Sequence, residues 1–290
     1  MCYHRTVSPG RVATKTRKHE KGVGLFRAFV VSWLMSVASV YGADDPLVRA
    51  RSLYNEGQFD AAIAAADQAR LTPARADAAD LVAARAYLER FRASAAPADL
   101  VSARDRLRRL DPQRFPVRER AEYIVGLGEA LFFDGAFGAA ANVFDPVLQS
   151  RDLLTSEARE RVLDWWASAI DRGAKPDRER KPRPESERQA MYDRIRARME
   201  EELATHPASA TAAYWRAAAA SAQGDQQAAW DAAQAGWVRA PLALDRGTAL
   251  RADLDRLVLR AIVPDRAKAT AQTPESLRQQ WESFKERWSR

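Results

Sequence analysis

Residues Leu127–Phe144, LGEALFFDGAFGAAANVF, decide the fold class of this chain. The pattern predicts two short helices that fold back on each other around Gly135. Gly128 and Ala140 stand where the two helices would cross, and their small size lets the helix axes approach closely. Phe137 would fill the space beside that crossing. Such a hairpin has an apolar face that it cannot bury alone, so we expect neighbouring hairpins to stack on it.

The same pattern returns twice in the chain. In Asp44–Pro73 the turn glycine is Gly57, and in Ser209–Pro241 it is Gly224. Proline closes the second helix of both copies, because it cannot continue a helix. Small residues again occupy the expected helix crossings: Ala50, Ala62, Ala217 and Ala229.

These three segments resemble the tetratricopeptide repeat, a stacked helical hairpin of about 34 residues. The third segment departs from the family pattern at Gln226, where an aromatic residue is usual, and we expect Trp215, Trp230 and Trp237 to supply the missing bulk. The resemblance implies an all-α, right-handed α-solenoid of about six helical hairpins. The helix Thr273–Trp288 would cap its C-terminal end.

Apolar residues at helical spacing predict further helices between these copies. Their expected ranges are Ala79–Phe91, Asp99–Leu110, Thr155–Asp171, Glu187–Thr205 and Gly247–Ile262. Ser156 is a candidate N-cap. We expect the helix that contains Asp145-Pro146 to stop or kink there, since an interior proline costs roughly 3 kcal/mol.

Residues 1–42 have the pattern of a secretory signal peptide. A basic segment, 1–27, precedes the apolar run Ala28–Val40, and small residues follow near Gly42. Cleavage near Gly42 would give an exported protein, either periplasmic or secreted. The alternative is a leader that stays uncleaved as an N-terminal membrane anchor.

The remaining chain divides into three parts. Residues 43–172 are expected to form N-terminal hairpins, and residues 187–290 the C-terminal hairpins with the capping helix. Between them, residues 173–186 contain the stretch KPDRERKPRPE, which predicts a charged, proline-rich loop or hinge.

The formal net charge of +7 lies mostly in the leader. Residues 1–27 contain seven Lys or Arg and one Glu, a net charge of +6, so seven minus six leaves about +1 for the rest. The basic balance therefore gives little reason to expect a nucleic-acid partner. Contact with a membrane is expected only through the leader, if the leader is uncleaved.

The sequence offers few residues for catalysis or metal binding. The single cysteine is Cys2, and His206 is the one histidine after the leader. A zinc site of ordinary ligands cannot be built from these, and a Ser-His-Asp or Cys-His arrangement has only His206 to offer as base, at a position most simply explained as a polar helix end. We therefore expect no metal, no cofactor and no enzyme activity. Glu200–Glu202 run around a helix and predict a solvated face.

One carboxylate supports an alternative function. Asp164 lies beside Trp165 and Trp166, and a carboxylate next to exposed tryptophan could bind or cleave sugar. The alternative is therefore a carbohydrate- or peptidoglycan-associated protein, whose enzymatic form would be a carboxylate-dependent hydrolase.

The family resemblance implies a binding groove. In such proteins the first helix of each hairpin lines a concave surface that binds extended peptides. The residues that the resemblance places there are Arg51, Tyr54, Asn55, Glu129, Phe133 and Tyr214. Arginine and aromatic residues often dominate binding energy. The favoured function is a non-catalytic protein–protein interaction scaffold of the cell envelope with a protein or peptide partner. A structural assembly component without a groove ligand is a further alternative.

Overall fold

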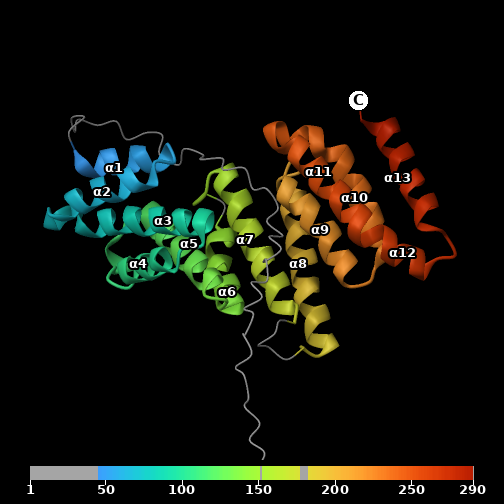
Figure 1. Cartoon of the computed structure of the whole chain (residues 1–290), viewed down its shortest axis with the longest axis horizontal. Coiled ribbons are helices and arrows are strands. Elements are labelled where there is room, and N and C mark those ends of the chain that lie inside the picture. Colours follow the sequence, from blue (N-terminus) through green and yellow to red (C-terminus); the bar gives the residue numbers. More distant parts are fainter. Residues whose placement is uncertain (1–44, 151, 177–181, 290) are drawn as a thin grey trace, which may run out of the picture. The chain divides into compact units, whose positions relative to one another are not determined.

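The computed structural model describes residues 45–150, 152–176 and 182–289, and the secondary structure in these ranges is entirely helical. The predicted all-α class is therefore confirmed (Figure 1). The N-terminal helices are α1 (Pro46–Asn55), α2 (Phe59–Arg70), α3 (Ala76–Ser94), α4 (Pro97–Leu107), α5 (Val117–Phe133), α6 (Phe137–Gln149) and α7 (Ser156–Ala174). The C-terminal helices are α8 (Glu185–Thr205), α9 (Ala210–Ala222), α10 (Gln226–Arg239), α11 (Gly247–Leu257), α12 (Val263–Ala269) and α13 (Pro274–Trp288).

Short helical segments join some of these elements. Three 3-10 helices are η1 (Pro73–Arg75), η2 (Pro112–Arg114) and η3 (Ala240–Arg246). The π-helical turn Val258–Ile262 connects α11 to α12 without a break, so these two labels mark one continuous helix. Counted in this way, the described ranges contain twelve helices.

The three predicted turn glycines have the same backbone conformation. Gly57, Gly135 and Gly224 have φ values of 76°, 77° and 79°. In each turn the preceding helix ends two residues before the glycine and the next begins two residues after it. The residue after the glycine donates its N–H to the carbonyl five positions back at 2.9–3.0 Å. A left-handed glycine of this kind ends a helix without the steric cost of a side chain.

The predicted close crossing lies between α5 and α6. A Cβ atom on Gly128 would overlap the ring of Phe144, so any larger residue there would force that ring to shift. Ala140 is fully buried on the facing helix, and the Phe137 ring packs 5.2 Å from Phe132 between ring centroids. The equivalent small residues of the other copies are also fully buried: Ala50, Ala62, Ala217 and Ala229.

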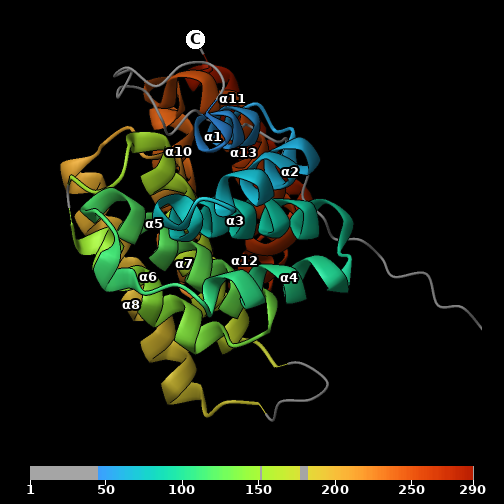
Figure 2. The ribbon, with the colours of Figure 1, turned by 90° about the vertical axis from the view of Figure 1, so that its left-hand side faces the viewer.

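The helices pack in a repeating order. Each helix contacts its neighbour in the chain, and α1, α3, α5, α7, α9 and α11 also contact one another in succession. We call α1, α3, α5, α7 and α9 the first-helix row. Four of them, α1, α3, α5 and α9, are each the first helix of a hairpin that the next helix completes. Figure 2 shows α1 and α2 above α3 and α4 in this arrangement. The described chain thus has a repeat-like helical architecture.

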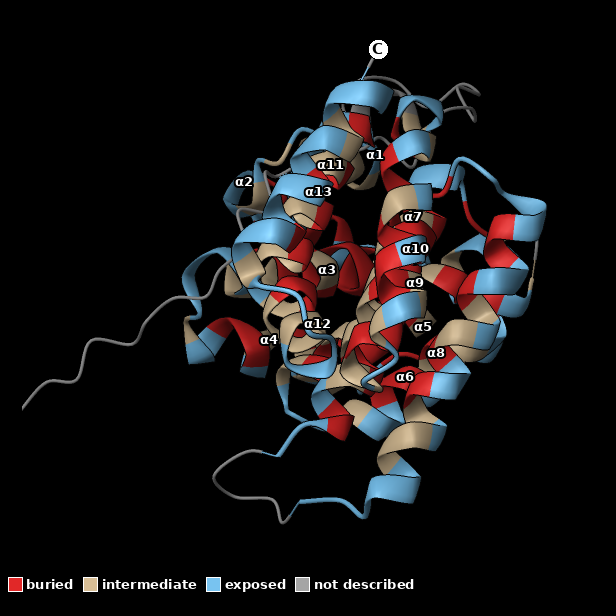
Figure 3. Cartoon of the chain, turned by 90° about the vertical axis from the view of Figure 1, so that its right-hand side faces the viewer, coloured by how far each residue is buried: buried red, intermediate tan, exposed pale blue. Residues whose placement is uncertain are grey.

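The buried core begins at Ala50 and ends at Trp281. Leu277 and Trp281 of α13 are fully buried, whereas most of the remaining residues of that helix are exposed (Figure 3). Within the described ranges the buried core thus runs through both the N-terminal and the C-terminal helices.

Three local predictions need correction. The stop or kink expected at Asp145-Pro146 is wrong as a stop, because α6 continues to Gln149 and buries Val147 and Leu148 beyond the proline. The N-cap of α7 is Thr155, whose hydroxyl accepts from the Ala158 N–H at 3.3 Å, and Ser156 is already helical. The predicted helix Asp99–Leu110 corresponds to α4, which ends at Leu107, three residues earlier than predicted.

Two predictions fall at least partly outside the described residues. The leader 1–42, with its expected cut near Gly42, lies outside them, and so do residues 177–181 of the charged loop. Among the helices of the described ranges, none has both the length and the apolar content needed to cross a bilayer.

Candidate functional site

Polar side chains of three neighbouring helices in the first-helix row surround one small pocket. Its lining residues are Arg85 of α3, Glu122, Val125 and Glu129 of α5, and Ala158, Arg161, Val162 and Trp165 of α7. Its volume of about 20 Å³ accommodates a group the size of a water molecule. The pocket is therefore a place where one small polar group can enter.

Helical spacing explains why these residues share the pocket. Glu122, Val125 and Glu129 are three and four residues apart, so they lie on one face of α5. Arg161 and Trp165 of α7 are four apart and lie on one face in the same way. Because α5 contacts both α3 and α7, these two faces and α3 meet at the pocket.

Charge contacts join the first three helices of the row. Arg85 of α3 lies 3.5 Å from Glu122 of α5, with their side chains 12% and 13% exposed. The Arg85 guanidinium also lies 4.9 Å from the ring centroid of Tyr54 on α1. Arg51 of α1 donates to Glu119 of α5. The helices α1, α3 and α5 are thus connected through buried and half-buried charges.

The ionisation of Glu129 is shifted by its surroundings. Burial, followed by the negative charge of Glu89, raises the pKa of Glu129 to about 7. The positive charges of Arg85, Arg92 and Arg161 act in the opposite direction but do not cancel the rise. Near neutral pH this carboxyl group can therefore either donate or accept a hydrogen bond.

Arg161 is the pocket cation that remains available. In the described part of the chain its guanidinium forms no hydrogen bond or ion pair, whereas Arg85 is engaged by Glu122 and Tyr54. Together Arg161 and Glu129 present one cationic donor and one titratable carboxyl to an entering group.

An aromatic cluster forms the wall beside these charges. The Trp165 ring packs edge-on against Phe132 and Phe133, with centroid distances of 4.7 and 5.3 Å. Phe133 in turn packs against Phe91 of α3 at 4.8 Å. The cluster joins α3, α5 and α7 and gives the pocket a rigid apolar side.

Four of the six predicted groove residues belong to this network: Arg51, Tyr54, Glu129 and Phe133. Asn55 is half-buried at the end of α1. Tyr214 lies further along the row on α9, where its ring packs 5.5 Å from Trp215. Burial, followed by the negative charge of Asp253, raises the pKa of Tyr214 to about 12.

The sequence prediction missed Arg85, Glu122 and Arg161 as pocket residues. Arg85 belongs to α3, and the turn after α3 has no glycine of the kind that marks the three repeat copies. Ala95 adopts the left-handed conformation there instead, with φ 54°. For Glu122 a sequence signal existed, because its spacing from Glu129 places both residues on one face of a helix.

The predicted pairing of Asp164 with neighbouring tryptophans is not formed. Asp164 accepts a hydrogen bond from the indole of Trp215 on α9 at 2.8 Å. Burial raises the pKa of Asp164, although that hydrogen bond lowers it. Trp166 is 2% exposed and donates to Asp145 at 2.7 Å, while Trp165 packs in the aromatic cluster. Asp164 therefore links α7 to α9, and neither adjacent tryptophan offers a free stacking face.

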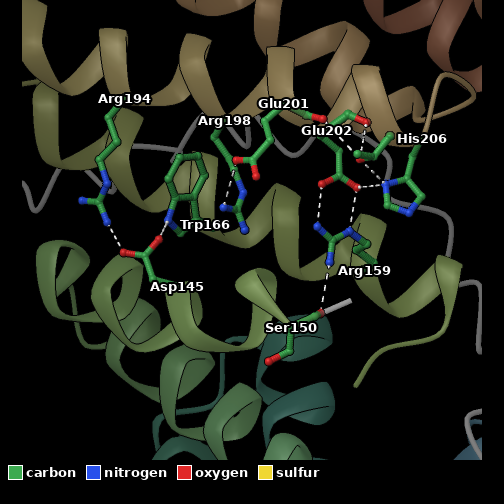
Figure 4. Close-up of polar contacts among 10 residues, drawn as sticks. Asp145, Ser150, Arg159, Trp166, Arg194, Arg198, Glu201, Glu202 and His206 are labelled. Carbon is green, nitrogen blue, oxygen red and sulfur yellow. Dashed lines mark hydrogen bonds and ion pairs between the residues drawn. The ribbon is translucent and has the colours of Figure 1, made fainter. Parts of the chain in front are cut away.

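A buried ion pair connects α7 to α8 (Figure 4). Arg159 donates from Nε and Nη2 to the two carboxylate oxygens of Glu202 at 2.6 and 2.7 Å. His206 Nδ1 lies 3.0 Å from the same carboxylate. The prediction of a solvated face for Glu200–Glu202 is thus wrong for Glu202, which is 2% exposed.

Comparison with known proteins adds no family to these observations: no family model matches the chain, and no curated protein matches it. Within the described residues, no group of three or more His, Cys, Asp or Glu side chains is placed to hold a metal ion. The function must therefore be argued from the geometry of the first-helix row.

Proposed function

We propose that this protein is a non-catalytic interaction scaffold that binds a protein or peptide partner along its first-helix row. The observation that carries the proposal is the convergence of α3, α5 and α7 on one pocket with an available cation, a titratable carboxyl and an aromatic wall. In this proposal the hairpins continue as a right-handed solenoid of the tetratricopeptide type, capped by α13.

The chemistry of the pocket favours recognition over catalysis. Its groups come from three successive helices of the first-helix row, so a partner that enters it contacts α3, α5 and α7 at once. Arg161 and Trp165 are residue types that frequently dominate binding energy at interfaces. The volume of about 20 Å³ fits one polar group the size of a water molecule, such as the end of a side chain, and not a whole substrate.

Site-specific crosslinking tests this proposal. A photoreactive residue would replace Asn55, Arg161 or Tyr214 on the first-helix row, and matched controls would carry it at exposed positions of second helices, Ala64 of α2 and Ala139 of α6. We expect a crosslinked partner from envelope extract at the three row positions. Crosslinking at the control positions alone, or at none of the five, would contradict the proposal.

The exported location is part of the same proposal and depends on the leader. N-terminal sequencing of protein recovered from the exported fraction should show that its first residue lies directly after Gly42. Recovery of the full leader on membrane-bound protein would support the anchor instead.

The contacts of Asp164 do not favour the hydrolase alternative, because Trp215 of α9 donates a hydrogen bond to this carboxylate of α7. Its test is simple: glycan hydrolysis that is lost in Asp164→Ala would restore it.

A further inference from the structure

One edge of the N-terminal hairpins concentrates positive charge. We call residues 45–49, 70–77 and 108–120 the basic edge; they include the start of α1, the end of α2, the start of α3 and the connection from α4 to α5. Ion pairs hold these segments together, since Arg75 bonds Asp45 and Arg114 lies 3.1 Å from Asp77. The basic edge contains eight arginines and four acids, so its net charge is +4.

The positive charge of the basic edge contrasts with the average of the remaining chain. The residues after the leader carry about +1 in total, so the part outside the basic edge is net negative on average, at about −3. Residues 246–268 form a second basic stretch, with six Arg or Lys and three Asp, a net charge of +3. The basic edge is thus one place where positive charge would attract an anionic partner.

The acids of the basic edge are already engaged, while several arginines are not. Asp45 and Asp77 bind arginines of the edge, Asp111 caps the Gln113 N–H, and Glu119 binds Arg51. Four edge arginines have no carboxylate partner within the described residues: Arg49, Arg109, Arg118 and Arg120. All four are exposed, so their charges are available to an external anion.

Exposed apolar side chains lie among these arginines. Leu71 is 83% exposed, Val117 62% and Val48 49%. Leu71 and Val117 are the two most exposed large hydrophobic residues of the described chain. Both stand where one element ends and the next begins, next to Arg70 and Arg118 respectively.

The chain enters the fold at the same edge. Asp45 is the N-cap of α1 and is paired with Arg75 of the edge. The apolar run Ala28–Val40 ends only five positions earlier in the sequence. The basic edge therefore includes the described residues nearest in sequence to that run.

We propose that the basic edge docks on an anionic phospholipid surface, with its unpaired arginines at the headgroups and Leu71 and Val117 inserted at the headgroup–acyl boundary. Positive charge combined with exposed apolar residues is the chemistry of interfacial membrane binding. Nucleic acid would use the arginines but would leave the two apolar tips without a role. This contact is independent of the partner bound by the first-helix row.

Vesicle co-sedimentation tests the proposal without the leader, using the chain from Ala43 that the proposed cleavage would produce, once a circular-dichroism spectrum shows that this chain is helical. We expect binding to phosphatidylcholine vesicles that contain phosphatidylglycerol and no binding to phosphatidylcholine alone, with affinity falling as salt rises. Each arginine near an anionic surface contributes roughly a five-fold change in affinity, so Arg109→Gln with Arg118→Gln should weaken binding about 25-fold. The matched control, Arg278→Gln with Arg287→Gln on exposed positions of α13, should change it less than two-fold.

A depth measurement separates membrane docking from general attraction to anions. The chain from Ala43 lacks cysteine, so a nitroxide label can be placed at Leu71→Cys, with Val238→Cys as an exposed control. We expect only the Leu71 label to become accessible to oxygen and protected from aqueous reagents on anionic vesicles. Failure of the wild-type chain to bind these vesicles, equal losses in the edge and control variants, or binding to duplex DNA without binding to vesicles would each overturn the proposal.

Discussion

Replacing Glu129 by glutamine should change how the stability of the protein depends on pH. Burial and the nearby Glu89 raise the pKa of Glu129 from its ordinary value of 4.5 to about 7 in the folded state. Between these two pH values the folded protein binds more protons than the unfolded chain, so its free energy of unfolding falls as pH rises. One pKa unit corresponds to about 1.4 kcal/mol, which limits the total loss to about 3 kcal/mol by pH 8.

Glu129→Gln keeps the size and polarity of the side chain but cannot ionise. We therefore expect the variant to equal the wild type near pH 4.5 and to exceed it by about 2–3 kcal/mol at pH 8. Urea denaturation at a series of pH values measures this difference. Glu200→Gln, at an exposed position of α8, is the control and should show no such trend. A Glu129→Gln variant that is less stable than the wild type at pH 8 would refute the assignment of a buried, poorly compensated carboxyl.

Two further predictions concern packing and the buried ion pair, and both use chemical denaturation. Gly128→Ala should destabilise the fold by about 1–3 kcal/mol, because the new methyl group would overlap Phe144. The control Gly138→Ala has open space around it and should stabilise the fold by about 0.5 kcal/mol. A Gly128→Ala variant that is more stable than the wild type would contradict the close crossing. Glu202→Leu should cost about 3–5 kcal/mol by leaving Arg159 buried without its partner, and adding Arg159→Leu should recover part of that loss. Equal losses in the single and double variants would argue against this coupling.

Features of the fold that depend on local backbone geometry could be predicted from the sequence. Gly57, Gly135 and Gly224 mark their turns because a left-handed residue is most easily a glycine. The N-caps at Asp45 and Thr273 follow in the same way from a polar residue directly before a proline.

The parts that the sequence could not predict depend on residues far apart in the chain. Glu202 resembles its exposed neighbours in sequence, and only Arg159, forty-three positions earlier, makes its burial possible. The pocket presents the same difficulty, because Arg85 comes from a hairpin whose turn uses Ala95 in place of a glycine. The repeat pattern located the first helices of the other hairpins but gave no register for this one.

The distribution of tryptophan along the stack has a practical consequence for unfolding studies. The described helices α1–α6 contain no tryptophan. Trp166, Trp215 and Trp281 each donate an indole hydrogen bond to an aspartate of another helix, and these aspartates lie on α6, α7 and α11 respectively. The tryptophan emission of the described residues therefore reports on the helices from α7 onward and on their contacts with α5 and α6. Since each hairpin contacts mainly its neighbours, α1–α4 could melt first while that emission stays constant. A thermal scan read only at the tryptophan band would then overestimate the temperature up to which the whole chain remains folded.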